Sequence, residues 1–172
     1  MKFELKKWNI EYIKDVAKYA NNEKIAKNLR NAFPFPYTYE DAEWYVKKCI
    51  EKGEVNQLCR AIVVNGEAIG SIGIFVREDV YCKTAEIGYW LGEPFWNNGL
   101  MSEAVKRLCD EAFETFDIIR IFAEPFAYNI GSRRTLEKAG FVLEGIMKRS
   151  VYKRGEIFDS CMYALIKENG VL

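Results

Sequence analysis

Residues 97–103 have the residue types of an anion-binding joint between a strand and a helix. Residues 85–91 predict a strand, and a helical apolar period begins near Gly99. Gly99 permits a positive φ and lets a ligand approach the backbone closely. The N–H groups in the first turn of a helix point outward at the positive end of its dipole, where they bind phosphate. Many such joints bind nothing, so the local pattern alone leaves both readings open.

Histidine is absent from the chain, which excludes His-dependent nucleophilic triads and zinc sites with His ligands. Acid–base chemistry at neutral pH therefore falls to carboxylates, Tyr, Lys, Ser, Cys or bound water. Glu86 is the most prominent carboxylate, because it stands in an otherwise apolar strand. Strand alternation places Glu86, Gly88 and Trp90 on one face. The alternative for Glu86 is an exposed or salt-bridged strand residue.

Apolar periodicity and turn signals predict alternating strands and helices around these residues. Asn65-Gly66 is a strong two-residue hairpin signal. Helices are predicted over residues 10–20, 23–29, 39–52, 99–115 and 129–139. Strands are predicted over residues 3–7, 58–64, 68–76, 85–91, 118–124, 141–151 and 157–166. This order predicts one α/β or α+β domain over residues 1–172, with helices packed on the faces of a sheet.

Composition restricts the function classes further. The 172 residues include 25 Lys+Arg and 25 Asp+Glu, 49% are apolar and 29% are charged, which is typical of a soluble globular domain. Zero net charge argues against an electrostatic nucleic-acid binder. Five scattered cysteines without a Cys-x-x-Cys pair favour a reducing compartment. With no signal-peptide pattern and no run of about 18 apolar residues, we expect a cytoplasmic protein without a membrane partner.

Several separate motifs, in the right order, resemble the GNAT acyltransferase superfamily. Residues 85–90 read Ala-Glu-Ile-Gly-Tyr-Trp, and residues 96–104 have the form Trp-x-x-Gly-x-x-Ser-Glu-Ala. Both are similar to the branch of ribosomal-protein N-terminal acetyltransferases and spermidine acetyltransferases. The similarity continues at residues 34–42, 129–132, 136–141, 144–145, 159 and 163–165. The resemblance implies an acetyl-CoA-dependent N-acetyltransferase with a mixed, mostly antiparallel central sheet and helices on both faces.

The resemblance implies acetyl-CoA as cosubstrate and no metal. The wider superfamily has Gln or Arg at the position of Trp96 and Gly or Ala at that of Met101, so backbone amides rather than an Arg side chain would hold the pyrophosphate. A backbone N–H near Leu91 would polarise the thioester carbonyl. The implied cofactor-binding residues are Trp90, Leu91, Gly92, Asn98, Gly99, Leu100, Met101, Ser102, Glu103 and Asn129.

The implied reaction is direct attack of an amine on the thioester. An alkyl ammonium with a pKa of about 10 must first lose a proton, which calls for a base. Glu86 matches a strand glutamate that acts as base in histone-acetylating relatives and is the first candidate. Glu124 matches a base of one ribosomal-protein acetylating group and is the second. Ser132 matches a serine that hydrogen-bonds the leaving CoA sulfur, whereas the superfamily's usual tyrosine is replaced by Leu136. Plain helix capping is the alternative for Asn129, and an ordinary first-turn residue is the alternative for Ser132.

Aromatic residues mark the expected acceptor side. Phe35, Tyr37 and Tyr152 are the predicted substrate-binding residues, with Phe33, Trp44 and Tyr45 in the same cluster. The alternative is that Trp44 and Tyr45 belong to the core. The implied partners are acetyl-CoA and an amine acceptor, either a small molecule or a protein N-terminus, and a homodimer stays open. The competing functions are a CoA-binding module without turnover and an acyltransferase that uses another acyl-CoA, such as succinyl-CoA.

Overall fold

A tight hairpin organises the first half of the sheet. Asn65 and Gly66 both adopt positive φ, 50° and 87°, as a two-residue hairpin turn requires. They join β2 (Gln57–Val64) to β3 (Glu67–Val76), and the short β1 (Glu4–Lys6) pairs with the outer edge of β2. β4 (Thr84–Leu91) continues the antiparallel pairing on the other side of β3.

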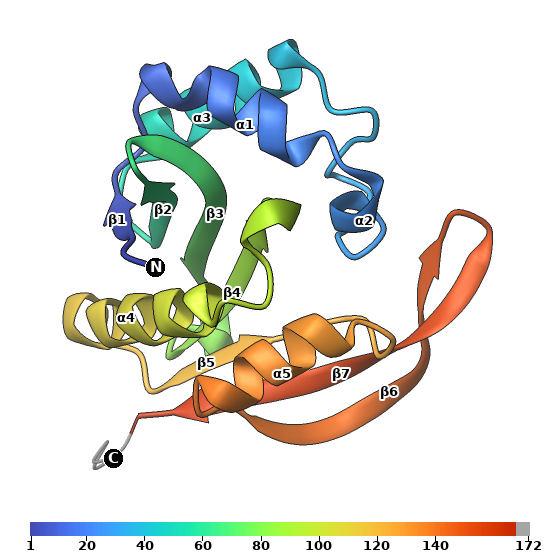
Figure 1. Ribbon diagram of the computed structural model, residues 1–172. Coiled ribbons are helices and arrows are strands. Elements are labelled where there is room, and N and C mark those ends of the chain that lie inside the picture. The colour runs from blue at the N-terminus through green and yellow to red at the C-terminus, as the bar shows by residue number, and fades with distance from the viewer. Residues whose placement is uncertain (168–172) are drawn as a thin grey trace.

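The computed structural model describes residues 1–167, in which seven strands form one sheet in the order β1-β2-β3-β4-β5-β7-β6 (Figure 1). β5 (Arg120–Ala123) runs parallel to β4, whereas the other neighbouring strands described here run antiparallel. β6 (Val142–Lys153) and β7 (Glu156–Ile166) form a long hairpin at the far edge. The predicted mixed, mostly antiparallel sheet is confirmed.

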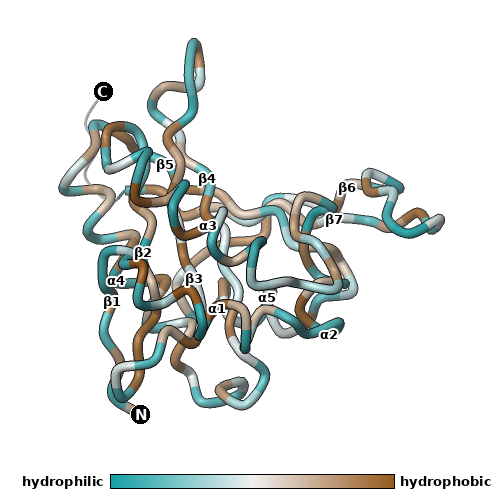
Figure 2. The backbone as a smooth tube through the Cα atoms, turned by 90° about the horizontal axis from the view of Figure 1, so that it is seen from above, coloured by the Kyte–Doolittle hydropathy of each residue, from teal (hydrophilic) through white to brown (hydrophobic). Residues whose placement is uncertain are grey.

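Helices cover both faces of this sheet (Figure 1). On one face lie the 3-10 turn η1 (Ile10–Tyr12), α1 (Ile13–Ala20) and α3 (Tyr39–Lys52), which bury Val16 and Val46 in one core cluster. On the other face lie α4 (Leu100–Thr115) and α5 (Ile130–Lys138), which bury Leu108 and Leu136 in a second cluster. Apolar residues follow β2 and β3 between the two clusters (Figure 2), because both faces of these strands are covered.

Short segments complete the connections. α2 (Glu23–Ala26) follows α1, and the 3-10 turns η2 (Asp79–Tyr81) and η3 (Glu93–Phe95) flank β4. The segments predicted as helices over residues 10–20, 39–52 and 129–139 begin with side-chain caps: Asn9, Thr38 and Asn129 each accept a backbone N–H. Thr38 and Asp41 form a complete capping box. None of the helices within residues 1–167 has the length and apolar character needed to span a membrane.

Two details differ from the expectation. The strand predicted over residues 118–124 is limited to Arg120–Ala123, the residues that pair with β7. The expected second helix over residues 23–29 ends at Ala26. Residues 27–29, which follow it, line the cleft described below.

Candidate functional site

β4 and β5 separate in the middle of the sheet and leave an opening between them. Their parallel pairing runs from Thr84–Arg120 to Glu86–Phe122, after which β4 continues to Leu91 while β5 ends at Ala123. A cleft of about 1300 Å³ surrounds this opening. Parallel strands that diverge in this way leave the backbone of the longer strand available to a ligand.

The amide of Leu91 faces this opening. The N–H of Gly92 donates to the carbonyl oxygen of Ile69 at 2.7 Å, so Gly92 faces β3. Because successive peptide groups of a strand point to opposite sides, the N–H groups of Leu91 and Tyr89 point towards β5. The Leu91 carbonyl accepts the Trp96 indole N–H at 2.7 Å, which ties the loop before α4 to the end of β4.

The start of α4 forms one wall of the cleft. Gly99 stands at its N-cap with a φ of 71°, and a Cβ added there would meet no atom within 4 Å. The Ser102 hydroxyl donates to the Gly99 carbonyl at 3.1 Å and fixes the first turn. Asn98, Leu100 and Met101 line the cleft beside it. The outward N–H groups of this turn and the missing side chain suit a phosphate ligand.

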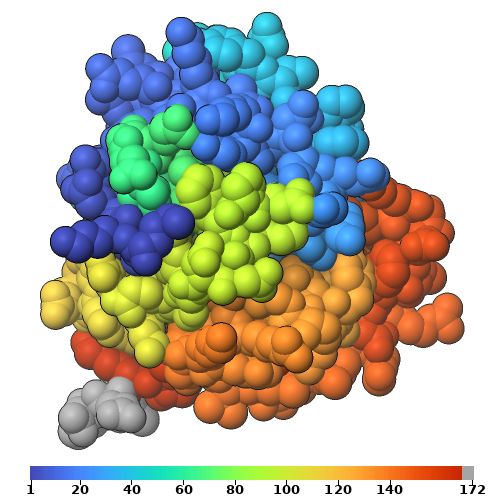
Figure 3. Space-filling view, in the orientation of Figure 1, coloured from blue at the N-terminus to red at the C-terminus, as the bar shows by residue number. Residues whose placement is uncertain are grey.

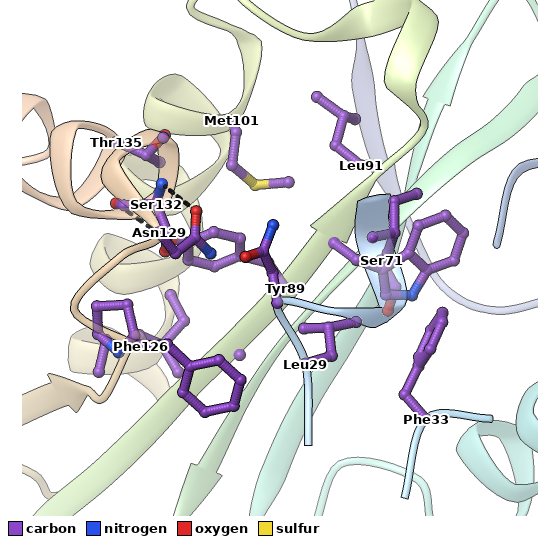
Figure 4. Close-up of a pocket in the computed structure, with 18 of the residues that line it drawn as sticks. Leu29, Phe33, Ser71, Tyr89, Leu91, Met101, Phe126, Asn129, Ser132 and Thr135 are labelled. Carbon is purple, nitrogen blue, oxygen red and sulfur yellow. Dashed lines mark hydrogen bonds between the residues drawn. The ribbon is translucent and has the colours of Figure 1, made fainter. Parts of the chain in front are cut away.

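The start of α5 faces it from the other side (Figure 4). Asn129 Oδ1 accepts the N–H of Ser132 at 3.2 Å, and the Ser132 hydroxyl lies 2.8 Å from the Tyr89 hydroxyl. Burial raises the pKa of the Tyr89 phenol, so it stays protonated at neutral pH. Tyr89 is a site residue that sequence reasoning missed. The sequence feature that points to Tyr89 is its position directly after Gly88 on β4.

The two candidate bases have different surroundings. The Glu86 side chain is 16% exposed and forms ion pairs with Arg30 and, at 3.5 Å, with Arg77. Glu124 lies just beyond β5 and accepts the Ser160 hydroxyl at 2.9 Å. Within residues 1–167, Glu124 forms no ion pair. Both line the cleft, so the structure brings the two predicted carboxylates to one site.

Aromatic residues form another wall of the cleft. The ring of Phe33 lies 4.8 Å from that of Tyr37 and 6.2 Å from that of Trp90. Tyr45 reaches the same cleft, where its hydroxyl lies 2.6 Å from that of Ser71. Trp44 is 65% exposed and so is not a core residue, which contradicts the core alternative for it. The predicted contact of Tyr37 with the cleft agrees with this placement.

Four predicted site residues lie outside the cleft lining. Phe35 and Tyr152 are exposed, at 42% and 71%, and the guanidinium of Arg154 packs over the Phe35 ring at 5.8 Å. Gly92 is a packing position, because a Cβ there would lie 3.0 Å from the Tyr19 ring. Glu103 lines an adjoining hollow, which shares Asn98, Gly99 and Leu100 with the cleft, and accepts the Arg107 guanidinium N–H at 2.9 Å. The structure therefore does not support ligand contacts in this cleft by the side chains of Phe35, Tyr152 and Glu103.

The segment around α2 closes the end of the cleft. Glu93 of η3 accepts hydrogen bonds from Asn22, at 2.7 Å, and from Lys24. In the space-filling view this contact brings the yellow-green β4–α4 connection against the blue N-terminal part, directly above the orange α5 (Figure 3). Lys153, at the tip of the β6–β7 hairpin, donates to the Leu29 carbonyl, and burial lowers its pKa. Sequence reasoning missed Arg30, which lines the cleft, because its contact with Glu86 joins distant segments.

The side chains that commonly bind metal ions are not clustered within residues 1–167. Across residues 1–167, no three Cys, Asp or Glu side chains lie close enough together to hold a metal ion.

Comparisons with known proteins agree with the motif-based expectation. Residues 2–142 match the family described as "Acetyltransferase (GNAT) domain". The uncharacterized N-acetyltransferase YoaA of Bacillus subtilis is 34% identical over 101 residues, which are 59% of this chain and 56% of YoaA. The uncharacterized N-acetyltransferase p20 of Bacillus licheniformis is 28% identical over 165 residues, 95% of this chain and 92% of p20.

Solved structures share the fold. The RimL ribosomal L7/L12 α-N-protein acetyltransferase in complex with coenzyme A superposes with a TM-score of 0.85, over 97% of this chain and 95% of that one, at 24% identity. This likeness confirms the seven-stranded mixed architecture. Because the family match spans residues 2–142, most of the sequence, the chain belongs to the GNAT acetyltransferase family.

Proposed function

We propose that the protein transfers an acetyl group from acetyl-CoA to a primary amine, either the α-amine of a protein N-terminus or the amine of a small molecule. The observation that carries this proposal is the opening between β4 and β5, at which the first turns of α4 and α5 converge. Relatives named as N-acetyltransferases and a related fold solved with coenzyme A support the same function.

The first turn of α4 would hold the pyrophosphate of acetyl-CoA. Gly99 leaves room for it, and the N–H groups that follow supply donors at the positive end of the helix dipole. Leu91 would donate its N–H to the thioester carbonyl, because that amide points into the opening. A donor fixed by the sheet stabilises the negative charge that develops on this oxygen during attack.

Glu124 is the base that the geometry favours. A base must offer a carboxylate lone pair to the ammonium proton, and Glu124 keeps this capacity because its one described side-chain partner, Ser160, is a neutral hydroxyl donor. Glu86 instead directs its oxygens at Arg30 and Arg77. We therefore assign Glu86 to the architecture of the acceptor side and Glu124 to removal of the proton, directly or through a water molecule.

Ser132 would receive the leaving sulfur. As the amine nitrogen bonds to the carbonyl carbon, the carbon–sulfur bond breaks, a thiolate departs, and the nitrogen gives its second proton to water. A thiolate has a conjugate-acid pKa of about 8.5, so a single hydrogen bond relieves much of its charge at neutral pH. The Ser132 hydroxyl lies at the start of α5, held by Tyr89, and can provide this hydrogen bond.

The test is release of the CoA thiol from acetyl-CoA against a panel of amines and short peptides. A thiol-reactive dye reports it, with the signal of the protein's own five cysteines subtracted. We expect amine-dependent release by the wild type. We expect Glu124→Gln to lower kcat about 100-fold at neutral pH, with the deficit shrinking as the pH approaches the pKa of the amine.

Glu86→Gln is the matched control for this experiment. It removes a carboxylate of the same cleft and should leave kcat within about tenfold of the wild type. A larger loss in Glu86→Gln than in Glu124→Gln would return the role of base to Glu86. If the wild type releases no CoA thiol with any amine, turnover is contradicted, and the protein is a CoA-binding module.

A further inference from the structure

Gly88 is an exposed residue in the middle of a seven-stranded sheet. β4 is the central strand, with β3 on one side and β5 on the other. Ile87 and Trp90, on the same strand as Gly88, are buried. Gly88 nonetheless lines the cleft and is exposed. A glycine inside a strand often marks a place where a ligand comes close to the backbone.

The space above Gly88 is empty of protein. A Cβ added at Gly88 would meet no atom within 4 Å. Its register partner on β3 is Gly73, but there the corresponding space is filled, because a Cβ would lie 2.9 Å from the Phe75 ring. The Phe75 ring therefore flanks the space above Gly88, and Trp90, two residues along the same face, borders it on another side.

The candidate reacting groups line the same cleft as Gly88. The β4–β5 pairing ends at Glu86–Phe122, and Glu124, which follows β5, lies on the cleft lining beyond that point. The residue after Gly88 on β4, Tyr89, carries the hydrogen bond to Ser132. Because Gly88 shares one cleft with Glu124 and Ser132, a group carried by the acceptor has access to the space above Gly88.

We propose that Gly88 sets the acceptor specificity by leaving room for an apolar group on the carbon next to the reacting amine. This inference rests on the proposed function and names its substrate class: α-amines of peptides whose first residue has a large apolar side chain. Phe75 and Trp90 give this space apolar walls and the missing side chain at Gly88 forms its floor, while the Glu86–Arg30 ion pair borders it on the side of Glu86.

The experiment compares peptides that differ only in the first residue, Leu or Phe against Ala or Ser. We expect the wild type to favour the Leu and Phe peptides by about tenfold in kcat/KM. Gly88→Val should lower kcat/KM for these peptides at least about tenfold, change the Ala and Ser peptides less than about threefold, and leave the KM for acetyl-CoA unchanged. Gly88→Ala should show the same pattern with a smaller effect.

Gly145→Val is the matched control. Gly145 is a β6 strand glycine, outside the cleft lining, whose added Cβ would also meet no atom within 4 Å, so its substitution tests the cost of a strand valine without filling the cleft. We expect wild-type kinetics from it. Melting temperatures near that of the wild type show that the Gly88 variants fold.

Three results would overturn the inference: an equal loss for large and small first residues, no loss for any peptide, or a weakened KM for acetyl-CoA. If the wild type acetylates small amines but no peptide, the substrate class is wrong while the proposed function stands. If it acetylates nothing, the proposed function fails and the inference fails with it.

Discussion

Tyr89 and Ser132 form the contact in the cleft that most directly bears on the leaving group. A serine hydroxyl has one proton to give, and its direction depends on which neighbour donates to its oxygen. Because burial raises the pKa of the Tyr89 phenol, that phenol remains a donor throughout the neutral pH range. Either hydroxyl can donate across the 2.8 Å contact between them, and when Tyr89 donates, the Ser132 proton is available to the sulfur. Tyr89 is thus a positioning residue that acts through Ser132.

We predict that Tyr89→Phe lowers kcat about five- to tenfold, which corresponds to the loss of one hydrogen bond of about 1 kcal/mol, with little change in the KM for acetyl-CoA. Steady-state kinetics in the wild-type and Ser132→Ala backgrounds check the mechanism. The effect of Tyr89→Phe should nearly vanish in the Ser132→Ala background, because the two side chains act as a unit. The same fold-loss in both backgrounds would show that Tyr89 acts independently of Ser132.

The carboxylates show what a sequence can and cannot predict about single residues. Strand alternation correctly indicated that Glu86 belongs to the face with Gly88 and Trp90, and both carboxylates line the cleft. Their ranking depends on Arg30, which lies 56 positions away in the chain and reaches Glu86 from the loop after α2. No local sequence pattern reports such a contact. The choice of Glu124 over Glu86 as the base therefore depends on the ion-pair partners of Glu86 in the structure.

At the scale of elements, the joint between β4 and α4 is the central feature. Gly99 has a positive φ, at 71°, that L-residues adopt only with strain, and its open side faces the cleft. The loop before it is held by the Trp96 indole and by Glu93, so the start of α4 is fixed before a ligand arrives. A fixed donor array loses less conformational entropy when it binds.

We predict that Gly99→Ala weakens acetyl-CoA binding at least about tenfold, because the methyl group crowds the pyrophosphate as well as straining the backbone. Gly53→Ala is the control: Gly53 also has a positive φ, at 60°, and an added Cβ would also meet no atom within 4 Å. Calorimetric titration should show the loss only in Gly99→Ala, while both variants lose about 1 kcal/mol of folding stability. Wild-type affinity in Gly99→Ala would place the phosphates elsewhere.

Local chemistry accounts for most of the elements. The Asn65-Gly66 turn was predicted from the sequence because it depends on two adjacent residues. The Thr38–Asp41 capping box is local in the same way, because its two residues are three positions apart. No local pattern reports the separation of β4 from β5, because it depends on how two strands distant in sequence pair. That separation creates the cleft.

At the scale of the whole molecule, two core clusters on opposite faces of one sheet support a cleft that opens through its centre. Contacts between distant segments close its acceptor end: Lys153 donates to the Leu29 carbonyl, and Arg154 pairs with Glu23 at 2.9 Å. The family resemblance predicted the architecture, because its motifs lie along nearly the whole sequence. The predicted acceptor contacts of Phe35 and Tyr152 were not supported, since aromatic character alone does not define direction.

Binding of acetyl-CoA by the folded chain is the central claim, and thermal unfolding tests it most directly. A ligand that binds only the native state adds about 2.7 kcal/mol at a concentration 100 times its Kd. For a chain of this size that addition raises Tm by roughly 5–10 °C. We predict a rise of this order with acetyl-CoA that grows with its concentration. An unchanged Tm at millimolar acetyl-CoA would contradict the account.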